Sequence, residues 1–142
     1  MRLLISACLL GEPCRYDGAS RPLPDEKLDR LLRDHTLIPV CPEQLGGLPT
    51  PRTPSERQGE RVIMRDGKDV TAEYDRGARL TCAIAAQTCA EAALLKARSP
   101  SCGCGAVYDG SFTGTLVPGD GVTAEQLKAR GLPVYTEETF PF

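Results

Sequence analysis

Three of the seven cysteines occupy equivalent places in the sequence pattern. Cys8, Cys41 and Cys102 each follow a short apolar run, and each stands at the start of a polar or glycine-rich loop. Thiolates are soft ligands that suit zinc or an iron–sulfur cluster. The chain contains one histidine, which excludes a site built on several imidazoles. This pattern indicates a metal centre made of sulfur donors.

The other four cysteines are weaker candidates for metal ligands. Cys82 and Cys89 are seven residues apart in an expected helix, which predicts that both pack in the core as small apolar side chains. Cys14 and Cys104 could each be a fourth ligand, a nearby thiol or neither. No pair has the Cys-x-x-Cys spacing of zinc ribbons or ferredoxins, so the metal signal comes from the strand-end context alone.

Polar side chains beside the cysteines could supply the rest of a catalytic site. Glu43 follows Cys41 by two residues, and its carboxyl could take or give a proton. Ser99 and Ser101 precede Cys102 and could hydrogen-bond a substrate or orient water, although loops favour serine for structural reasons too. Three further residues could anchor an anion or a carbonyl group, although a solvated side chain is the commoner case: Arg15, Arg52 and Arg98.

The elements that must position these cysteines are three apolar runs at residues 3–5, 37–40 and 92–95. They are continuous rather than alternating, as in strands that are covered on both faces. In a parallel sheet the strands finish at one edge, so the cysteines that follow them would converge there. Pro39 fits poorly in a central strand. The third run could instead be the end of the preceding helix.

Helical patterns separate these runs. Residues 25–32 place Leu28, Leu31 and Leu32 on one face of a short amphipathic helix. An alanine-rich helix is expected from Thr71 to about residue 91, and a capping box at 123–126 opens a helix that runs to about residue 130, before a strand at 132–135. Residues 42–60 form a long irregular loop in this interpretation. The alternation predicts an α/β fold: a mainly parallel, doubly wound, Rossmann-like sheet between layers of helices.

Composition bounds the class of protein. The chain has 142 residues, 41% hydrophobic and 25% charged, with a net charge of -2. The length predicts one domain over residues 1–142. The near-neutral charge argues against an extended nucleic-acid-binding surface. The apolar stretch before Cys8 is shorter than the roughly 7 residues that a signal peptide needs, and no run approaches a membrane span. We therefore expect a cytoplasmic protein, in which cysteines serve metals or catalysis more often than disulfides.

Three blocks of sequence resemble the thiouracil desulfidase family over nearly the whole chain. They are SACLLG at 6–11 with CRYDG at 14–18, CPEQLGGLPTPR at 41–52, and KARSPSCG at 96–103. The resemblance implies a bacterial enzyme with a [4Fe-4S] cluster held by three cysteines, which match Cys8, Cys41 and Cys102. It also implies catalytic roles at Glu43 and Ser99, with Ser101 carried over beside them.

The reaction implied by this resemblance is the non-redox desulfuration of a small thiolated base such as 2-thiouracil. The substrate sulfur would bind the open iron and leave as sulfide, while Glu43 deprotonates the attacking water and Ser99 holds the substrate or the developing charge. Three alternatives stay open. They are a zinc- or cluster-binding module without catalysis, a persulfide-forming sulfurtransferase that uses Cys14 or Cys104, and the same chemistry on thiolated RNA, against which the near-neutral charge and 5% aromatic content count.

Overall fold

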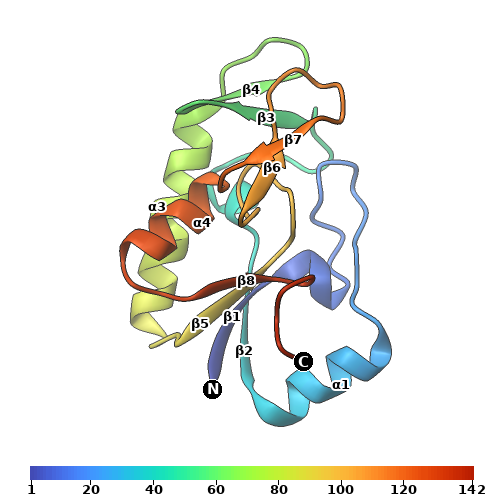
Figure 1. The fold of residues 1–142 in the computed structure, drawn as a ribbon, viewed down its shortest axis with the longest axis vertical. Helices are drawn as coiled ribbons and strands as arrows, with labels where there is room; N and C mark the ends of the chain where they lie inside the picture. Colours follow the sequence, from blue (N-terminus) through green and yellow to red (C-terminus); the bar gives the residue numbers. More distant parts are fainter.

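The computed structural model describes residues 1–142 as a four-stranded sheet, two hairpins and helices on both faces of the sheet (Figure 1). The elements in chain order are β1 (Arg2–Ser6), the 3-10 helix η1 (Ala7–Leu10), α1 (Asp25–Asp34), β2 (Thr36–Val40), α2 (Pro42–Leu45), β3 (Ser55–Gln58), β4 (Arg61–Met64), α3 (Thr71–Gln87), β5 (Ala92–Leu95), β6 (Ala106–Tyr108), β7 (Leu116–Pro118), α4 (Val122–Ala129) and β8 (Val134–Thr136). No helix is long and apolar enough to span a membrane.

The main sheet has the order β2-β1-β5-β8, and all its neighbouring strands are parallel. Each of the three predicted apolar runs is therefore a strand, and the alternative that residues 92–95 end a helix is wrong. All four residues of β5 are buried, because this strand lies between two others. Pro39 lies in β2 at the sheet edge, where a missing N–H group is tolerated.

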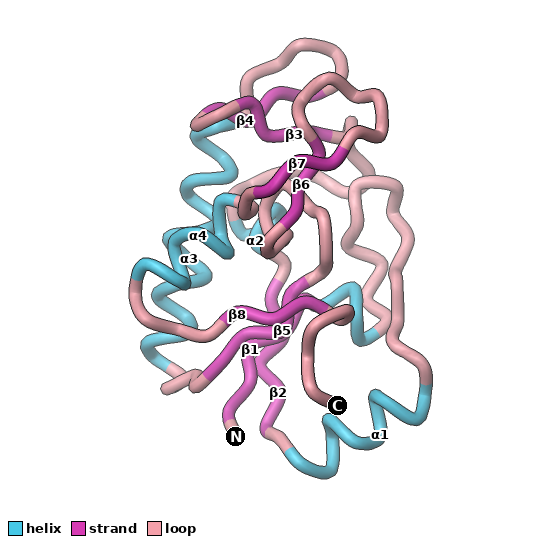
Figure 2. Tube along the Cα trace, in the orientation of Figure 1, coloured by secondary structure: helices cyan, strands magenta, loops and turns pink.

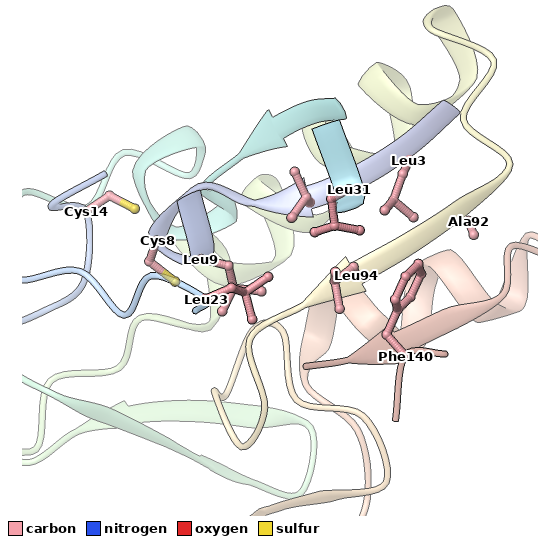
Figure 3. Packing of buried hydrophobic residues seen from close by; sticks show 10 residues of the cluster. Leu3, Cys8, Leu9, Cys14, Leu23, Leu31, Ala92, Leu94 and Phe140 are labelled. Atoms are coloured by element: carbon pink, nitrogen blue, oxygen red, sulfur yellow. The ribbon is translucent and has the colours of Figure 1, made fainter. Parts of the chain in front are cut away.

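Helices cover the two faces of the sheet, which confirms the predicted α/β architecture. On one face, Leu3 and Leu94 pack with Leu31 of α1 and with Phe140 near the C-terminus. Figure 3 shows Cys8 and Cys14 toward one end of this cluster. On the other face, the core combines side chains of the sheet with those of α3 and α4: Leu4, Ala93, Leu95, Cys82, Ala85 and Leu127. The crossover helices thus lie on opposite faces, as in a doubly wound fold.

Several local predictions were wrong. Helix α3 ends at Gln87, so Cys89 lies beyond it and is exposed rather than packed in the core. Leu32 of α1 is 66% exposed, so the buried face of this helix is narrower than predicted. The N-cap of α4 is Gly121 without a side-chain cap, because Thr123 bonds to Ser101 instead of closing a capping box.

Helix α2 lies inside the segment predicted as loop and packs tightly on α3. A Cβ atom on Gly46 would overlap the backbone oxygen of Glu73, and one on Gly77 would overlap that of Pro42. Neither glycine has a positive φ. They are therefore required for the close approach of the two backbones rather than for an unusual backbone conformation.

The two hairpins, β3–β4 and β6–β7, lie beyond the carboxyl edge of the main sheet (Figure 2). Both are antiparallel, and the β6–β7 hairpin confirms the turn expected near residues 108–112. The Glu56 side chain of β3 accepts hydrogen bonds from the backbone N–H groups of Gly110 and Phe112. This contact joins the hairpins into a cover over the strand ends.

Candidate active site

A cavity of about 380 Å³ lies between the carboxyl ends of the sheet strands and the hairpins. In open α/β sheets, ligands bind at the point where the strand order reverses, which here is between β1 and β5. The cavity lining includes five of the six residues predicted from the sequence to form the site: Cys8, Cys41, Glu43, Ser99 and Cys102. The sixth, Ser101, does not line it.

The three cysteines reach the cavity from three different strand ends. Cys8 belongs to η1 directly after β1, Cys41 follows β2 as the N-cap of α2, and Cys102 lies in the turn after β5. Cys8 and Cys102 are buried, Cys41 is partly buried, and none of the three forms a disulfide. The convergence expected from parallel strand ends is thus observed.

Ser6 ties these strand ends together, although the sequence analysis gave it no role. Its Oγ accepts a hydrogen bond of 2.9 Å from the backbone N–H of Lys96, which joins the end of β1 to the end of β5. The same hydroxyl hydrogen-bonds the Cys102 thiol and lowers its pKa. The sequence marks Ser6 only as a polar residue at the last position of a buried strand.

Burial makes the thiols weak acids when no metal is bound. It raises the pKa of Cys8 to about 11, and it raises that of Cys102 further despite the hydrogen bond from Ser6. Metal ligation needs thiolates, so binding a metal here must release protons.

The remaining cavity thiol is Cys14. It is buried, and the Cys41 thiol donates a hydrogen bond of 3.7 Å to the Cys14 backbone oxygen. Burial raises the pKa of the Cys14 thiol, as does the neighbouring Cys41. Cys104 does not line the cavity, and its thiol donates to the Val134 backbone oxygen at 3.6 Å.

The thiols around the cavity form a soft donor set, which suits zinc or an iron–sulfur cluster. A four-iron cluster binds each thiolate at a different iron, so three cysteines would hold three of its four irons.

Glu43 on α2 is held by two donors. The Tyr74 hydroxyl donates to Oε1 at 2.5 Å, and the Arg52 Nε donates to the same oxygen at 3.3 Å. Oε2 makes no hydrogen bond with the protein, and no buried side-chain oxygen lacks a partner, so Oε2 is accessible from the cavity. This oxygen is free to accept a proton.

The three arginines considered in the sequence analysis all line the cavity. Arg15 pairs with Asp17, and Arg98 pairs with Glu138 at 2.9 Å. The Arg52 side chain is only 2% exposed, so the interpretation of this residue as a solvated arginine is wrong. Its fixed partners make it part of the scaffold around Glu43.

Ser99 and Ser101 have different surroundings although they are two residues apart. The Ser99 Oγ accepts hydrogen bonds from the backbone N–H groups of Ser101 and Cys102, both at 3.1 Å, so its own proton is free to be donated into the cavity. Ser101 is 1% exposed, and its hydroxyl bonds to that of Thr123 at 2.9 Å. Ser99 is therefore placed to contact a substrate, and Ser101 joins the turn to α4.

Known proteins resemble this chain over nearly its whole length. The family model described as 2-thiouracil desulfurase matches residues 3–139. The chain belongs to the 2-thiouracil desulfurase family. It is 40% identical to the uncharacterized protein YbbK of Bacillus subtilis, with 95% of each chain covered. A solved structure of the [4Fe-4S]-dependent thiouracil desulfidase TudS superposes with a TM-score of 0.94 at 46% identity, covering 99% of this chain and 93% of that one.

As in other parallel α/β folds, the site of this 2-thiouracil desulfurase family member combines strand-end residues with loop residues. Sequence reasoning found the strand-end thiols, Glu43 and Ser99, because each follows an apolar run. It missed Tyr74, which lies in α3 and reaches the cavity only because α2 packs on that helix. The only signal for Tyr74 was a bulky aromatic residue in an alanine-rich helix.

Proposed function

We propose that this chain removes sulfur from a small thiolated pyrimidine such as 2-thiouracil, with a [4Fe-4S] cluster held by Cys8, Cys41 and Cys102. The observation that carries the proposal is the convergence of three unpaired thiols on one cavity beside a carboxylate with a free oxygen. Membership of the 2-thiouracil desulfurase family and the likeness to TudS support the same conclusion.

The cavity fits this assignment in both chemistry and size. Its soft donor set is typical of iron–sulfur sites. A volume of about 380 Å³ lies within the range of roughly 300–1,000 Å³ that small-molecule sites occupy. Three protein ligands leave one iron open, so the bound cluster supplies a thiophilic Lewis acid that polarises the thiocarbonyl of the substrate.

The side chains of this protein then carry out the proton chemistry. Oε2 of Glu43 takes a proton from a water molecule, whose oxygen attacks the ring carbon that carries sulfur. The Ser99 hydroxyl donates a hydrogen bond to the charge that develops on the substrate. The C–O bond forms and the C–S bond breaks, so a thiocarbonyl and water give a carbonyl and hydrogen sulfide. No net electron transfer is required.

Persulfide chemistry is a second candidate, because Cys14 lies in the same cavity as Cys41. Such a reaction would need a donor that already carries sulfane sulfur, such as thiosulfate, because the sulfide-level sulfur of a thiocarbonyl cannot form a persulfide without an oxidant. Transfer from that donor would survive removal of iron and would be abolished by alkylation of the thiols. Cys104 does not support it, because that residue does not line the cavity.

The test of the proposed function is anaerobic purification followed by an iron and sulfide count, an absorption spectrum and an assay of 2-thiouracil conversion to uracil. We expect about four irons per chain and the release of uracil and sulfide in equal amounts, with turnover lost after iron chelation. A colourless protein after anaerobic reconstitution would exclude the cluster. Turnover that survives chelation would show that the cluster is not required for the reaction.

Replacing Ser99 by alanine is expected to lower kcat by about 10²-fold, the effect of losing one hydrogen-bond donor to a developing charge. The matched variant is Ser101→Ala, whose hydroxyl faces Thr123 instead of the cavity. We expect that variant to lose about 1–3 kcal/mol of stability, because Thr123 is left without its partner, while kcat is retained. Thermal unfolding and steady-state kinetics measure both. A loss of kcat in Ser101→Ala would restore the catalytic role predicted for Ser101 from the sequence.

A further inference from the structure

Tyr74 is a buried aromatic residue whose only polar side-chain atom is directed at the catalytic carboxylate. The residue is 2% exposed, and its hydroxyl donates to Oε1 of Glu43 at 2.5 Å. Tyr74 also lines the cavity. A leucine or phenylalanine would fill the same core space, so the hydroxyl requires an explanation of its own.

Arg52 donates to the same carboxylate oxygen but has several other partners. It donates to the backbone oxygens of Pro49 and Cys14 and to the Thr50 hydroxyl. Arg52 therefore also holds loops together, whereas the Tyr74 hydroxyl gives its single proton to Glu43 and accepts a hydrogen bond from the Ser55 side chain. Both donors occupy Oε1, which leaves Oε2 as the working oxygen.

The packing of α2 on α3 brings the Tyr74 hydroxyl close to Glu43. Gly46 and Gly77 let the two backbones touch, because a side chain on either glycine would collide with the backbone of the other helix. The close approach places Glu43 of one helix within hydrogen-bond distance of Tyr74 of the other.

The phenol is suited to be a permanent donor. Burial raises the pKa of Tyr74 well above its usual range, and the adjacent Glu43 carboxylate raises it further. The hydroxyl therefore carries its proton at neutral pH and can donate it in a hydrogen bond. It donates to Oε1 but does not compete with Oε2 for the proton of water.

We propose that Tyr74 is a positioning residue of the reaction: by binding Oε1 of Glu43, it fixes the carboxylate in one orientation with Oε2 directed at the attacking water. This role rests on the proposed function only for its kinetic readout. The orientation of the carboxylate itself can be observed without turnover.

The first test compares Tyr74→Phe with Tyr135→Phe, which removes a phenol hydroxyl from β8 outside the cavity. We expect Tyr74→Phe to lower kcat about 10-fold or more, the effect of a hydrogen bond to a charged group, with KM within about twofold and the iron content unchanged. Tyr135→Phe should keep its kcat. An unchanged kcat in Tyr74→Phe, or a loss that follows the loss of iron, would overturn the proposal.

The second test uses Glu43→Asp, whose shorter side chain withdraws the carboxylate from Tyr74. If Tyr74 acts through Glu43, adding Tyr74→Phe to this variant should lower kcat by less than about threefold, because coupled residues are not additive. A full additional loss would indicate a general structural effect of the phenol.

Crystal structures provide the readout that does not depend on activity. We expect one Glu43 carboxylate orientation in the unmodified protein and more than one in Tyr74→Phe. An ordered carboxylate in the variant would refute the proposal even if the wild-type protein has no activity on 2-thiouracil.

Discussion

Cys102→Ala is expected to abolish cluster binding and, with it, activity. Cys102 is a buried thiol in the turn after β5, and it shares the cavity with Cys8 and Cys41. Two remaining ligands cannot fix a four-iron cluster in one geometry. We expect a fall of at least about 10³-fold in kcat/KM, because Lewis-acid polarisation is worth several kcal/mol.

The matched control is Cys82→Ala, which removes a buried thiol that packs against the sheet from α3. Cys82 does not line the cavity, so this variant should keep its iron and its turnover while losing a small amount of stability. Iron and sulfide counts on anaerobically prepared protein distinguish the two variants. Full iron content in Cys102→Ala combined with its loss in Cys14→Ala would show that Cys14, not Cys102, is the third ligand.

The part of this site that could be predicted from the sequence is the part that the sheet positions. The strands of a parallel sheet all end at the same edge. A short apolar run followed by cysteine therefore predicts both a strand and the position of that cysteine at this edge. Cys8, Cys41 and Cys102 meet at one cavity for that reason, although they span most of the chain. Glu43 and Ser99 follow from the same pattern, since each is close to such a strand end.

The part that could not be predicted depends on how helices pack and where they end. Tyr74 reaches Glu43 only through the glycine contact between α2 and α3, and no periodicity in either segment encodes that contact. Ser101 is directed away from the cavity because Thr123 of α4 offers its hydroxyl a buried partner. Cys89 is exposed because α3 stops at Gln87, a boundary that the alanine-rich pattern does not mark.

The proposed mechanism gives Glu43 and the cysteines separable roles, which the variant Glu43→Gln tests. The amide has nearly the size of the carboxylate, and its oxygen can accept the hydrogen bonds that Tyr74 and Arg52 now donate to Oε1. Its NH₂ group then replaces Oε2 and cannot accept a proton. We expect the iron content and the brown colour to be retained while kcat falls by about 10²–10⁴-fold, the usual contribution of a general base.

The second variant at this position, Glu43→Ala, separates the loss of a base from the loss of a contact. It removes the carboxylate and leaves space beside Tyr74 and Arg52, so formate added to the assay should restore part of kcat if a carboxylate is all that is missing. Acetate matches the atoms that the substitution removes, so it should restore at least as much of kcat as formate, and acetamide is the matched control, because its amide cannot accept a proton. Full activity in Glu43→Gln would remove Glu43 from the mechanism. Loss of iron in both variants would instead show that the carboxylate supports the cluster-binding loop, because a general base acts on water and has no part in holding the metal.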